Sequence, residues 1–159
     1  MVQFLKLNQS LMISDNLKQV KSRIDSVQGS QKVELIAVSK TRSPSEIQEA
    51  VEAGQVHFGE NYLQESIEKI NFFKGSGLTW HFIGPIQSNK TSPIADNFDW
   101  VHSVDRIKIA KRLSEQRNPA LGALKILIQV NVDKEQTKSG VDIEKVGELV
   151  EEIEKLPNL

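Results

Sequence analysis

The sequence contains no cysteine, a single tyrosine and no long apolar run. The lack of cysteine excludes disulfides, thiolate metal sites and thiol catalysis, and it fits a reducing compartment. No apolar stretch approaches the about 20 residues that a membrane span needs. The first residues lack the long apolar stretch and the small-residue cleavage site of a signal peptide. We therefore expect a cytoplasmic protein that does not bind membranes.

The sequence also lacks an excess of either charge. Its 20 basic and 21 acidic side chains give a formal net charge of -1, so nothing electrostatic points to nucleic acid or to an anionic membrane. The 159 residues, 38% apolar and 26% charged, are typical of one globular domain with a sizeable core. The spacing of His57, His81 and His102 matches no zinc signature. His57 and His102 adjoin aromatic or β-branched residues, so we expect core or rim histidines rather than metal ligands.

Short apolar strands alternate with amphipathic helices along the whole chain. A first helix is expected over about 10–27. The strands that follow are expected over 33–39, 56–59, 78–84, 100–104 and 123–132. The later helices are expected over 44–53, 61–73, 88–95, 105–116 (capped by Asp105) and 142–155. This order predicts a parallel sheet covered by helices. A doubly wound open sheet suits the length, whereas a (β/α)8 barrel typically needs about 250 residues.

Lys40 ends the first expected strand. Loss of water at the end of a buried strand disfavours the lysine cation and can turn the side chain into a nucleophilic amine that forms a Schiff base. The alternative is that Lys40 leaves the core and reaches solvent. Functional groups gather at the carboxyl ends of parallel strands, and all five expected ends are polar. Polar strand ends are equally expected wherever loops meet water.

Four blocks, taken in order, resemble the pyridoxal phosphate homeostasis proteins (the YggS/PROSC family). They read AVSKT at 37–41, FGENYLQE at 58–65, WHFIGPIQSNK at 80–90 and QVNVDKEQTKSG at 129–140. The resemblance implies an α/β fold, namely a parallel (β/α) barrel of the fold-type III pyridoxal phosphate (PLP) class, like the alanine racemase N-terminal domain. About five of the eight βα units of such a barrel are present. Residues 1–159 are then expected to form a single, incomplete PLP-binding domain.

The resemblance also implies the residues of a cofactor site. Lys40 would hold pyridoxal 5′-phosphate as an internal aldimine, and the polar loop over 131–140 would supply a lysine that contacts or receives the cofactor. The further residues expected to bind the cofactor lie at strand ends or in this loop, and they are Asn61, His81, Ile83, Asn131 and Lys138.

The implied function is that of a non-catalytic PLP carrier and regulator in intracellular vitamin B6 homeostasis. Apo forms of PLP-dependent enzymes are the candidate recipients, and a monomer is expected. Racemases of this fold need a second acid–base residue, typically a tyrosine from a partner domain, and Tyr62 is the only tyrosine here. A racemase-like PLP enzyme and a cofactor-free Schiff-base aldolase acting through Lys40 remain as alternatives.

One departure from the family concerns length. Family members continue through three further strand–helix units, which carry a serine- and glycine-rich phosphate-binding loop and an arginine, whereas this sequence ends at residue 159. We therefore expect a truncated member that holds the cofactor weakly. A truncated product with little cofactor binding is a further alternative.

Overall fold

The computed structural model describes residues 12–27, 29–135 and 137–159. The chain divides into two compact units. The smaller comprises residues 1–35 and 42–55, and the larger comprises residues 36–41 and 56–159. In the described part of the chain, no helix combines the length and the apolar character needed to cross a membrane.

The smaller unit contains two helices, α1 (Ile13–Val27) and α2 (Pro44–Glu52). A capping box begins α2, in which Ser43 Oγ accepts a hydrogen bond from the Glu46 amide at 3.3 Å and Glu46 Oε2 accepts one from the Ser43 amide at 2.8 Å. Pro44 fits the first helical position because its missing N–H would have no partner there. These local signals explain why α2 begins where the sequence predicts.

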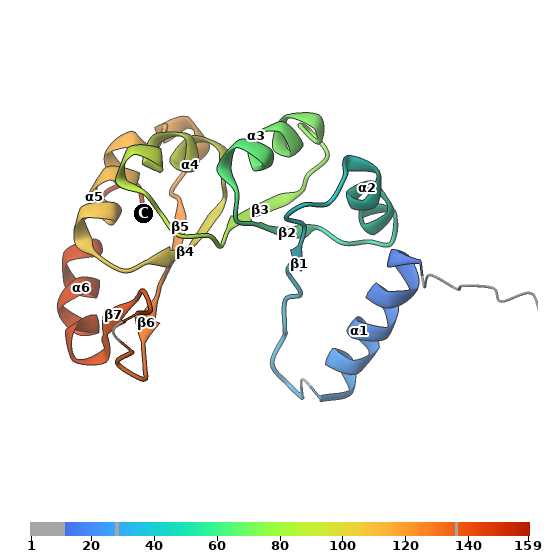
Figure 1. Ribbon diagram of the computed structural model, residues 1–159, viewed down its shortest axis with the longest axis horizontal. Helices are drawn as coiled ribbons and strands as arrows, with labels where there is room; N and C mark the ends of the chain where they lie inside the picture. The colour runs from blue at the N-terminus through green and yellow to red at the C-terminus, as the bar shows by residue number, and fades with distance from the viewer. Residues whose placement is uncertain (1–11, 28, 136) are drawn as a thin grey trace, which may run out of the picture. The chain divides into compact units, whose positions relative to one another are not determined.

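The larger unit is built on a five-stranded parallel sheet (Figure 1). Its strands are β1 (Ala37–Val38), β2 (His57–Glu60), β3 (Thr79–Phe82), β4 (Trp100–Val104) and β5 (Lys125–Ile128). The helices that follow them are α3 (Leu63–Phe72), α4 (Thr91–Asn97), α5 (Ile107–Gln116) and α6 (Val146–Ile153). A small parallel pair, β6 (Val130–Asn131) and β7 (Val141–Asp142), lies between β5 and α6 in the chain. Single 3-10 turns span Ser88–Lys90, Pro119–Leu121 and Ile143–Lys145.

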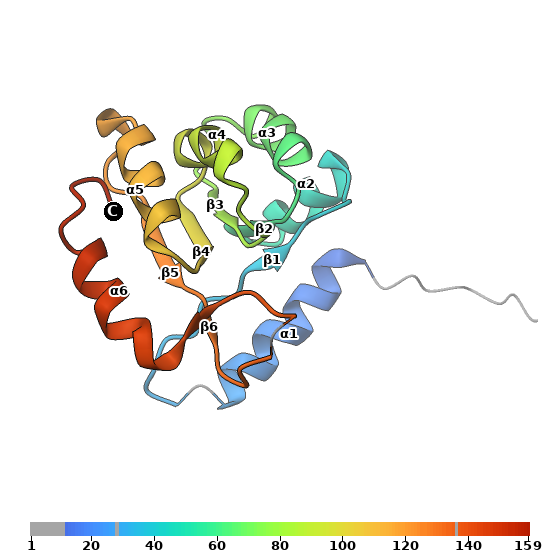
Figure 2. The ribbon, with the colours of Figure 1, turned by 60° about the vertical axis from the view of Figure 1, so that its left-hand side comes forward.

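The strand order distinguishes the two architectures that the sequence leaves open. The strands follow one another as β1-β2-β3-β4-β5, with no reversal. A doubly wound sheet reverses its strand order and carries helices on both faces. Right-handed crossovers between strands in sequential order instead bring every helix to the same face, and Figure 2 shows α3, α4 and α5 in a row on one side of the sheet. The larger unit is therefore part of a (β/α) barrel, as the sequence resemblance implied.

The two faces of this sheet differ in chemistry. Phe58 and Trp80 are paired in register and lie on the helix-covered face together with Phe73. The ring centroid of Trp80 lies 5.6 Å from that of Phe58 and 6.3 Å from that of Phe73. Because side chains alternate along a strand, the neighbouring residues His57 and His81 lie on the opposite face. The aromatic core thus sits between the sheet and the helices.

Several element boundaries differ from the prediction. The strand predicted over 33–39 is reduced to Ala37–Val38. β1 lies at the edge of the sheet, and its one neighbour, β2, begins only one residue before the Phe58 that pairs with Ala37. Toward the N-terminus, β2 therefore offers β1 at most one further residue to pair with, although the apolar residues continue in that direction.

The prediction that Asp105 caps a helix is wrong. The N-cap residue of α5 is Arg106, and the Asp105 carboxylate instead accepts a hydrogen bond from Arg106 Nη1 at 2.5 Å. The strand predicted over 123–132 is divided into β5 and β6. The helix predicted over 142–155 is shorter, since β7 and a 3-10 turn occupy its first residues.

Candidate functional site

The carboxyl ends of β1, β2 and β3 lie side by side. Beyond the strands themselves, the Ser39 amide donates to Gly59 O at 2.9 Å and the Ile83 amide donates to Glu60 O at 2.9 Å. Lys40 follows Ser39, and Asn61 follows Glu60 at the end of β2. The parallel register therefore brings Lys40 and Asn61 to the same end of the sheet. Strand ends of this kind carry the active sites of barrel proteins.

Lys40 is exposed, and its ammonium group makes no hydrogen bond or ion pair within the described part of the chain. The structure thus places this side chain in solvent, which was the second of the two expectations for it. Its amine is accessible to a carbonyl compound.

Asn61 carries a buried acceptor next to this end of the sheet. The residue is half-buried, and its Oδ1 atom is buried with no hydrogen-bond partner among the described residues. The chain after β3 approaches it closely, because a Cβ atom on Gly84 would lie only 2.5 Å from Asn61 O. Only glycine permits this approach. A hydrogen-bond donor of a bound molecule would satisfy the unpartnered oxygen.

Ile83 is the second predicted site residue near this strand end. It is half-buried, and its Cδ1 atom lies 3.1 Å from the position that a Cβ on Gly59 would occupy. Ile36 Cγ2 lies 3.2 Å from the same position. The two branched side chains therefore cover Gly59 and form an apolar floor below the ends of β1 and β2.

His81 belongs to a row of three histidines. His57 Nδ1 lies 3.0 Å from His81 Nε2, and His81 Nδ1 lies 2.9 Å from His102 Nε2. The His81 ring also stacks on Trp100, with centroids 5.7 Å apart and an interplanar angle of 14°. Both ring nitrogens of His81 are thus engaged by other histidines. Burial lowers the pKa of His102 below its ordinary value.

Within residues 12–27, 29–135 and 137–159, no group of three or more histidine, cysteine, aspartate or glutamate side chains could hold a metal ion. His57 and His102 are half-buried, as expected of rim histidines, whereas His81 is only 4% exposed. Sequence reasoning missed their adjacency, since the histidines are separated by 24 and 21 residues along the chain.

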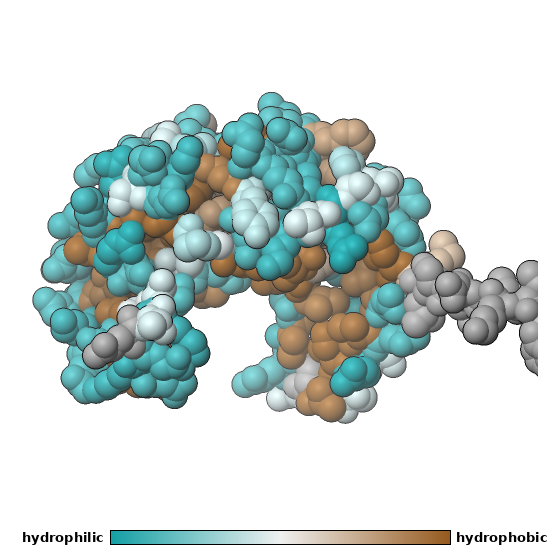
Figure 3. All heavy atoms as spheres, viewed as in Figure 1, coloured by the Kyte–Doolittle hydropathy of each residue, from teal (hydrophilic) through white to brown (hydrophobic). Residues whose placement is uncertain are grey.

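Asn131 is the last residue of β6, and Lys138 lies in the polar segment between β6 and β7. Lys138 Nζ forms an ion pair with Glu135 Oε1 at 2.6 Å. Asn131 Nδ2 donates to Glu135 O at 2.9 Å. Figure 3 shows this segment as a hydrophilic surface. Their contacts among the described residues stay within the segment, and none joins them to Lys40.

A buried ion pair behind β1 was also missed by sequence reasoning. Lys69 Nζ, on α3, donates to Glu60 Oε1 at 2.8 Å and to Glu65 Oε1 at 2.5 Å. Lys69 is 4% exposed and Glu60 is 0% exposed. The bond from Lys69 is the main reason why the pKa of Glu65 is lowered. The spacing of Glu65 and Lys69 by four residues on a helix was the available signal, but nothing in the sequence indicated that the pair is enclosed.

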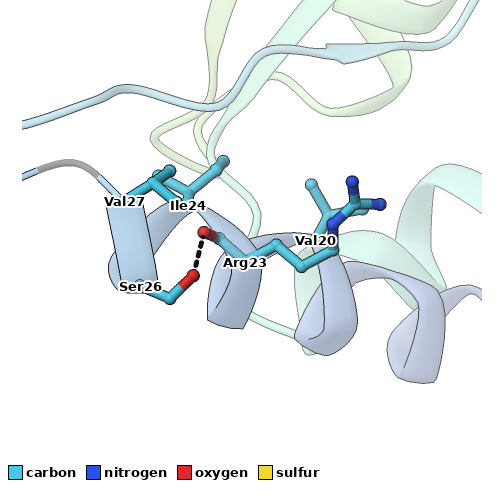
Figure 4. A pocket seen from close by; sticks show the side chains of 5 residues that line it. All are labelled: Val20, Arg23, Ile24, Ser26 and Val27. Atoms are coloured by element: carbon cyan, nitrogen blue, oxygen red, sulfur yellow. Dashed lines mark hydrogen bonds between the residues drawn. The ribbon is translucent and has the colours of Figure 1, made fainter.

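Each of the two units contains a hollow that is lined by described residues. The first, of about 610 Å³, lies beyond the ends of β2 and β3 and is lined among others by Asn61, Tyr62, Gln87 and Lys90. The second, of about 460 Å³, lies along α1 (Figure 4). Its lining residues are Val20, Arg23, Ile24, Ser26 and Val27, and the Ser26 hydroxyl donates to Arg23 O at 2.7 Å. Only the first hollow includes a predicted site residue.

Comparison with known proteins places this strand end in context. Residues 12–159 match the family model described as alanine racemase, N-terminal domain. The chain is 44% identical over 155 residues to the pyridoxal phosphate homeostasis protein of Escherichia coli (strain K12), covering 92% of this chain and 66% of that protein. It is 46% identical over 156 residues to the protein of the same name from Pasteurella multocida (strain Pm70), covering 94% of this chain and 67% of that protein. The chain belongs to the pyridoxal phosphate homeostasis proteins.

Solved structures agree with membership of the pyridoxal phosphate homeostasis family. PipY of Synechococcus elongatus PCC7942, determined with PLP bound, matches with a TM-score of 0.77 and 35% identity over 91% of this chain and 65% of that chain. Alanine racemase from Corynebacterium glutamicum matches with a TM-score of 0.68 at 18% identity, covering 92% of this chain and 41% of that chain, which shows the shared fold alone. The chain spans about two thirds of the length of the curated relatives that it matches (66% for the Escherichia coli protein).

Proposed function

We propose that this protein binds PLP covalently through Lys40 and serves PLP homeostasis as a non-catalytic carrier. Among the described residues, neither the exposed amine of Lys40 nor the Oδ1 acceptor of Asn61 has a hydrogen-bond partner, and both residues follow strands at the same end of the sheet. This observation carries the proposal. The names of the relatives support a role in PLP homeostasis, and the PLP-bound PipY structure supports PLP as the cofactor.

The residues present fit the chemistry of PLP. When bound, PLP supplies an aldehyde, which condenses reversibly with a primary amine. Lys40 offers that amine, and the Asn61 amide offers a hydrogen bond to a polar group of the cofactor. Lys69 cannot compete with Lys40, because it is buried and its three donors are all occupied, by Ser39 O, Glu60 and Glu65.

The arrangement supports holding the cofactor better than it supports turnover of an amino acid. Racemisation needs a second acid–base group facing the first. Tyr62, the only tyrosine, is 55% exposed at the N-cap of α3 and lines the hollow beyond β2 and β3. No observation on the described residues favours a cofactor-free aldolase.

The remaining parts of the proposal rest on the sequence resemblance. Residues 1–159 are proposed to belong to one PLP-binding barrel domain in a monomeric, cytoplasmic protein, with apo PLP-dependent enzymes as recipients. His81, Ile83, Asn131 and Lys138 are proposed as further cofactor-binding residues. For Asn131 and Lys138, this requires the segment between β6 and β7 to exchange its internal bonds with Glu135 for bonds to the cofactor.

The test is a visible absorbance titration with PLP, followed by borohydride reduction and peptide mass mapping. We expect one reduced adduct on Lys40, at near-stoichiometric PLP, which is absent from Lys40→Ala. The matched control is Lys111→Ala on α5, since Lys111 is also exposed without a side-chain partner among the described residues and does not line the hollow beside Asn61. Labelling that is scattered over many lysines, or unchanged by Lys40→Ala, would contradict the proposal. PLP-dependent racemisation of a single-enantiomer amino acid would contradict the non-catalytic part.

A further inference from the structure

Side chains of α3 bond both peptide units that flank Lys40, and a side chain of β2 bonds the Ser39 hydroxyl. On the N-terminal side, Ser39 O accepts a hydrogen bond from Lys69 Nζ at 2.6 Å. The Ser39 hydroxyl donates to Glu60 Oε1 at 2.6 Å. Ser39 is itself buried. The residue before Lys40 is therefore fixed through both its backbone and its side chain.

On the C-terminal side, the Thr41 backbone adopts a conformation that is rare for its residue type. Its φ angle is 63°, in the left-handed region that β-branched residues seldom occupy. The Thr41 amide donates to Glu65 Oε1 at 2.6 Å, a charge-assisted bond that holds this conformation. Strained backbone of this kind persists only where the surroundings over-determine it, and it clusters at functional sites.

One ammonium group joins the two sides. Lys69 Nζ has three N–H donors, and it directs them to Ser39 O, Glu60 and Glu65. A buried ion pair is weak evidence for stability, because apolar side chains of similar size often serve as well. Glu60 Oε2 is moreover buried without a partner among the described residues. Apolar side chains at these three positions could stabilise the fold equally well, but they could not form hydrogen bonds that fix the backbone at the end of β1.

We propose that Glu60, Glu65 and Lys69 are positioning residues that fix the direction in which Lys40 leaves β1. By holding Ser39 and Thr41, they aim the Lys40 amine toward the side of the sheet end where Asn61 lies, and so set the rate of PLP capture. This inference rests on the proposed function. In the capture step, the neutral Lys40 amine adds to the aldehyde carbon, a C=N bond replaces the C=O bond, and the aldehyde oxygen leaves as water with the two amine protons.

Glu65→Ala is the sharpest test, because Glu65 is only partly buried and the variant leaves the Glu60–Lys69 pair in place. The matched control is Glu68→Ala, on the same helix, where the exposed carboxylate has no partner among the described residues. Stopped-flow absorbance measures the capture rate, and reduction with peptide mapping confirms the site. We expect capture about ten-fold slower in Glu65→Ala, which loses the charge-assisted hydrogen bonds from both the Thr41 amide and Lys69, and unchanged in the control. Glu65→Gln should restore much of the rate, since its amide oxygen still accepts from Thr41.

A thermal melt of each PLP-free variant separates positioning from folding. A merely structural role would lower the melting temperature of Glu65→Ala while its folded fraction captured PLP at the parent rate, and that result would overturn the inference. Equal rates in Glu65→Ala and Glu68→Ala would overturn it too. A double variant, Glu60→Gln with Lys69→Met, removes both buried charges together and should also fold and capture slowly. If the parent chain forms no adduct on Lys40, the proposed function fails. If the parent forms the adduct and the Glu65→Ala variant captures PLP at the parent rate, only the positioning inference fails.

Discussion

Gly84→Ala tests whether the ends of β2 and β3 are as closely fitted as the structure indicates. A Cβ atom at this position would lie 2.5 Å from Asn61 O, 2.9 Å from Asn61 Cα and 3.0 Å from Asn61 C. All three atoms are backbone, so rotation of a side chain cannot relieve the contact. Ordinary contact begins near 3.4 Å, so the backbone segments at Gly84 and Asn61 must separate by about 0.9 Å (3.4 minus 2.5).

The expected loss of stability follows from this displacement. Overpacking a well-fitted site by one methyl group typically costs about 1–3 kcal/mol. Urea denaturation followed by circular dichroism measures the free energy of unfolding. The same substitution moves Asn61, so we also expect weaker PLP binding in the absorbance titration.

Gly147→Ala is the matched control for this prediction. Gly147 lies in α6, a Cβ there would meet nothing within 4 Å, and its φ angle is not positive. Because alanine is the better helix former, this variant should be unchanged or more stable by up to about 1 kcal/mol. A Gly84→Ala variant whose stability and PLP binding both match those of Gly147→Ala would refute the close-approach argument.

Two further predictions concern pH and helix capping. Burial lowers the pKa of His102 from its ordinary value, so the unfolded chain binds more protons than the folded one as the pH falls. The His102 contribution to stability is therefore complete above pH about 6.5 and is lost below it. Between pH 7.5 and 5, the free energy of unfolding should fall less in His102→Gln than in the parent. An equal fall in the variant and the parent would contradict this prediction. Ser43→Ala removes the side-chain acceptor of the α2 capping box and should cost about 1 kcal/mol, measured by urea denaturation against the exposed control Ser92→Ala. An equal effect of the two serine variants would show that the cap adds nothing.

The sequence by itself determined the type and order of nearly all elements of the larger unit. The alternation of apolar strands with helices predicted the parallel sheet, and β4 (Trp100–Val104) was predicted with its observed bounds. Local chemistry was sufficient there, because hydrophobic periodicity reports which residues a helix or strand will bury. The sequence also identified the family, since four blocks, of which the first contains Lys40, occur in the family order.

Only the tertiary structure decided the strand order, the end of β1 and the surroundings of Lys40. The sequential strand order, which excludes the doubly wound alternative, depends on which strands pair across the sheet rather than on any one segment. The row of His57, His81 and His102 forms because three separate strands align in register. Likewise, Lys69 reaches Ser39 across 30 residues of sequence only because α3 packs behind β1 and β2. Contacts of this kind join residues that no local pattern relates. The side chains that bond the peptide units on either side of Lys40 could therefore be identified only from the tertiary structure.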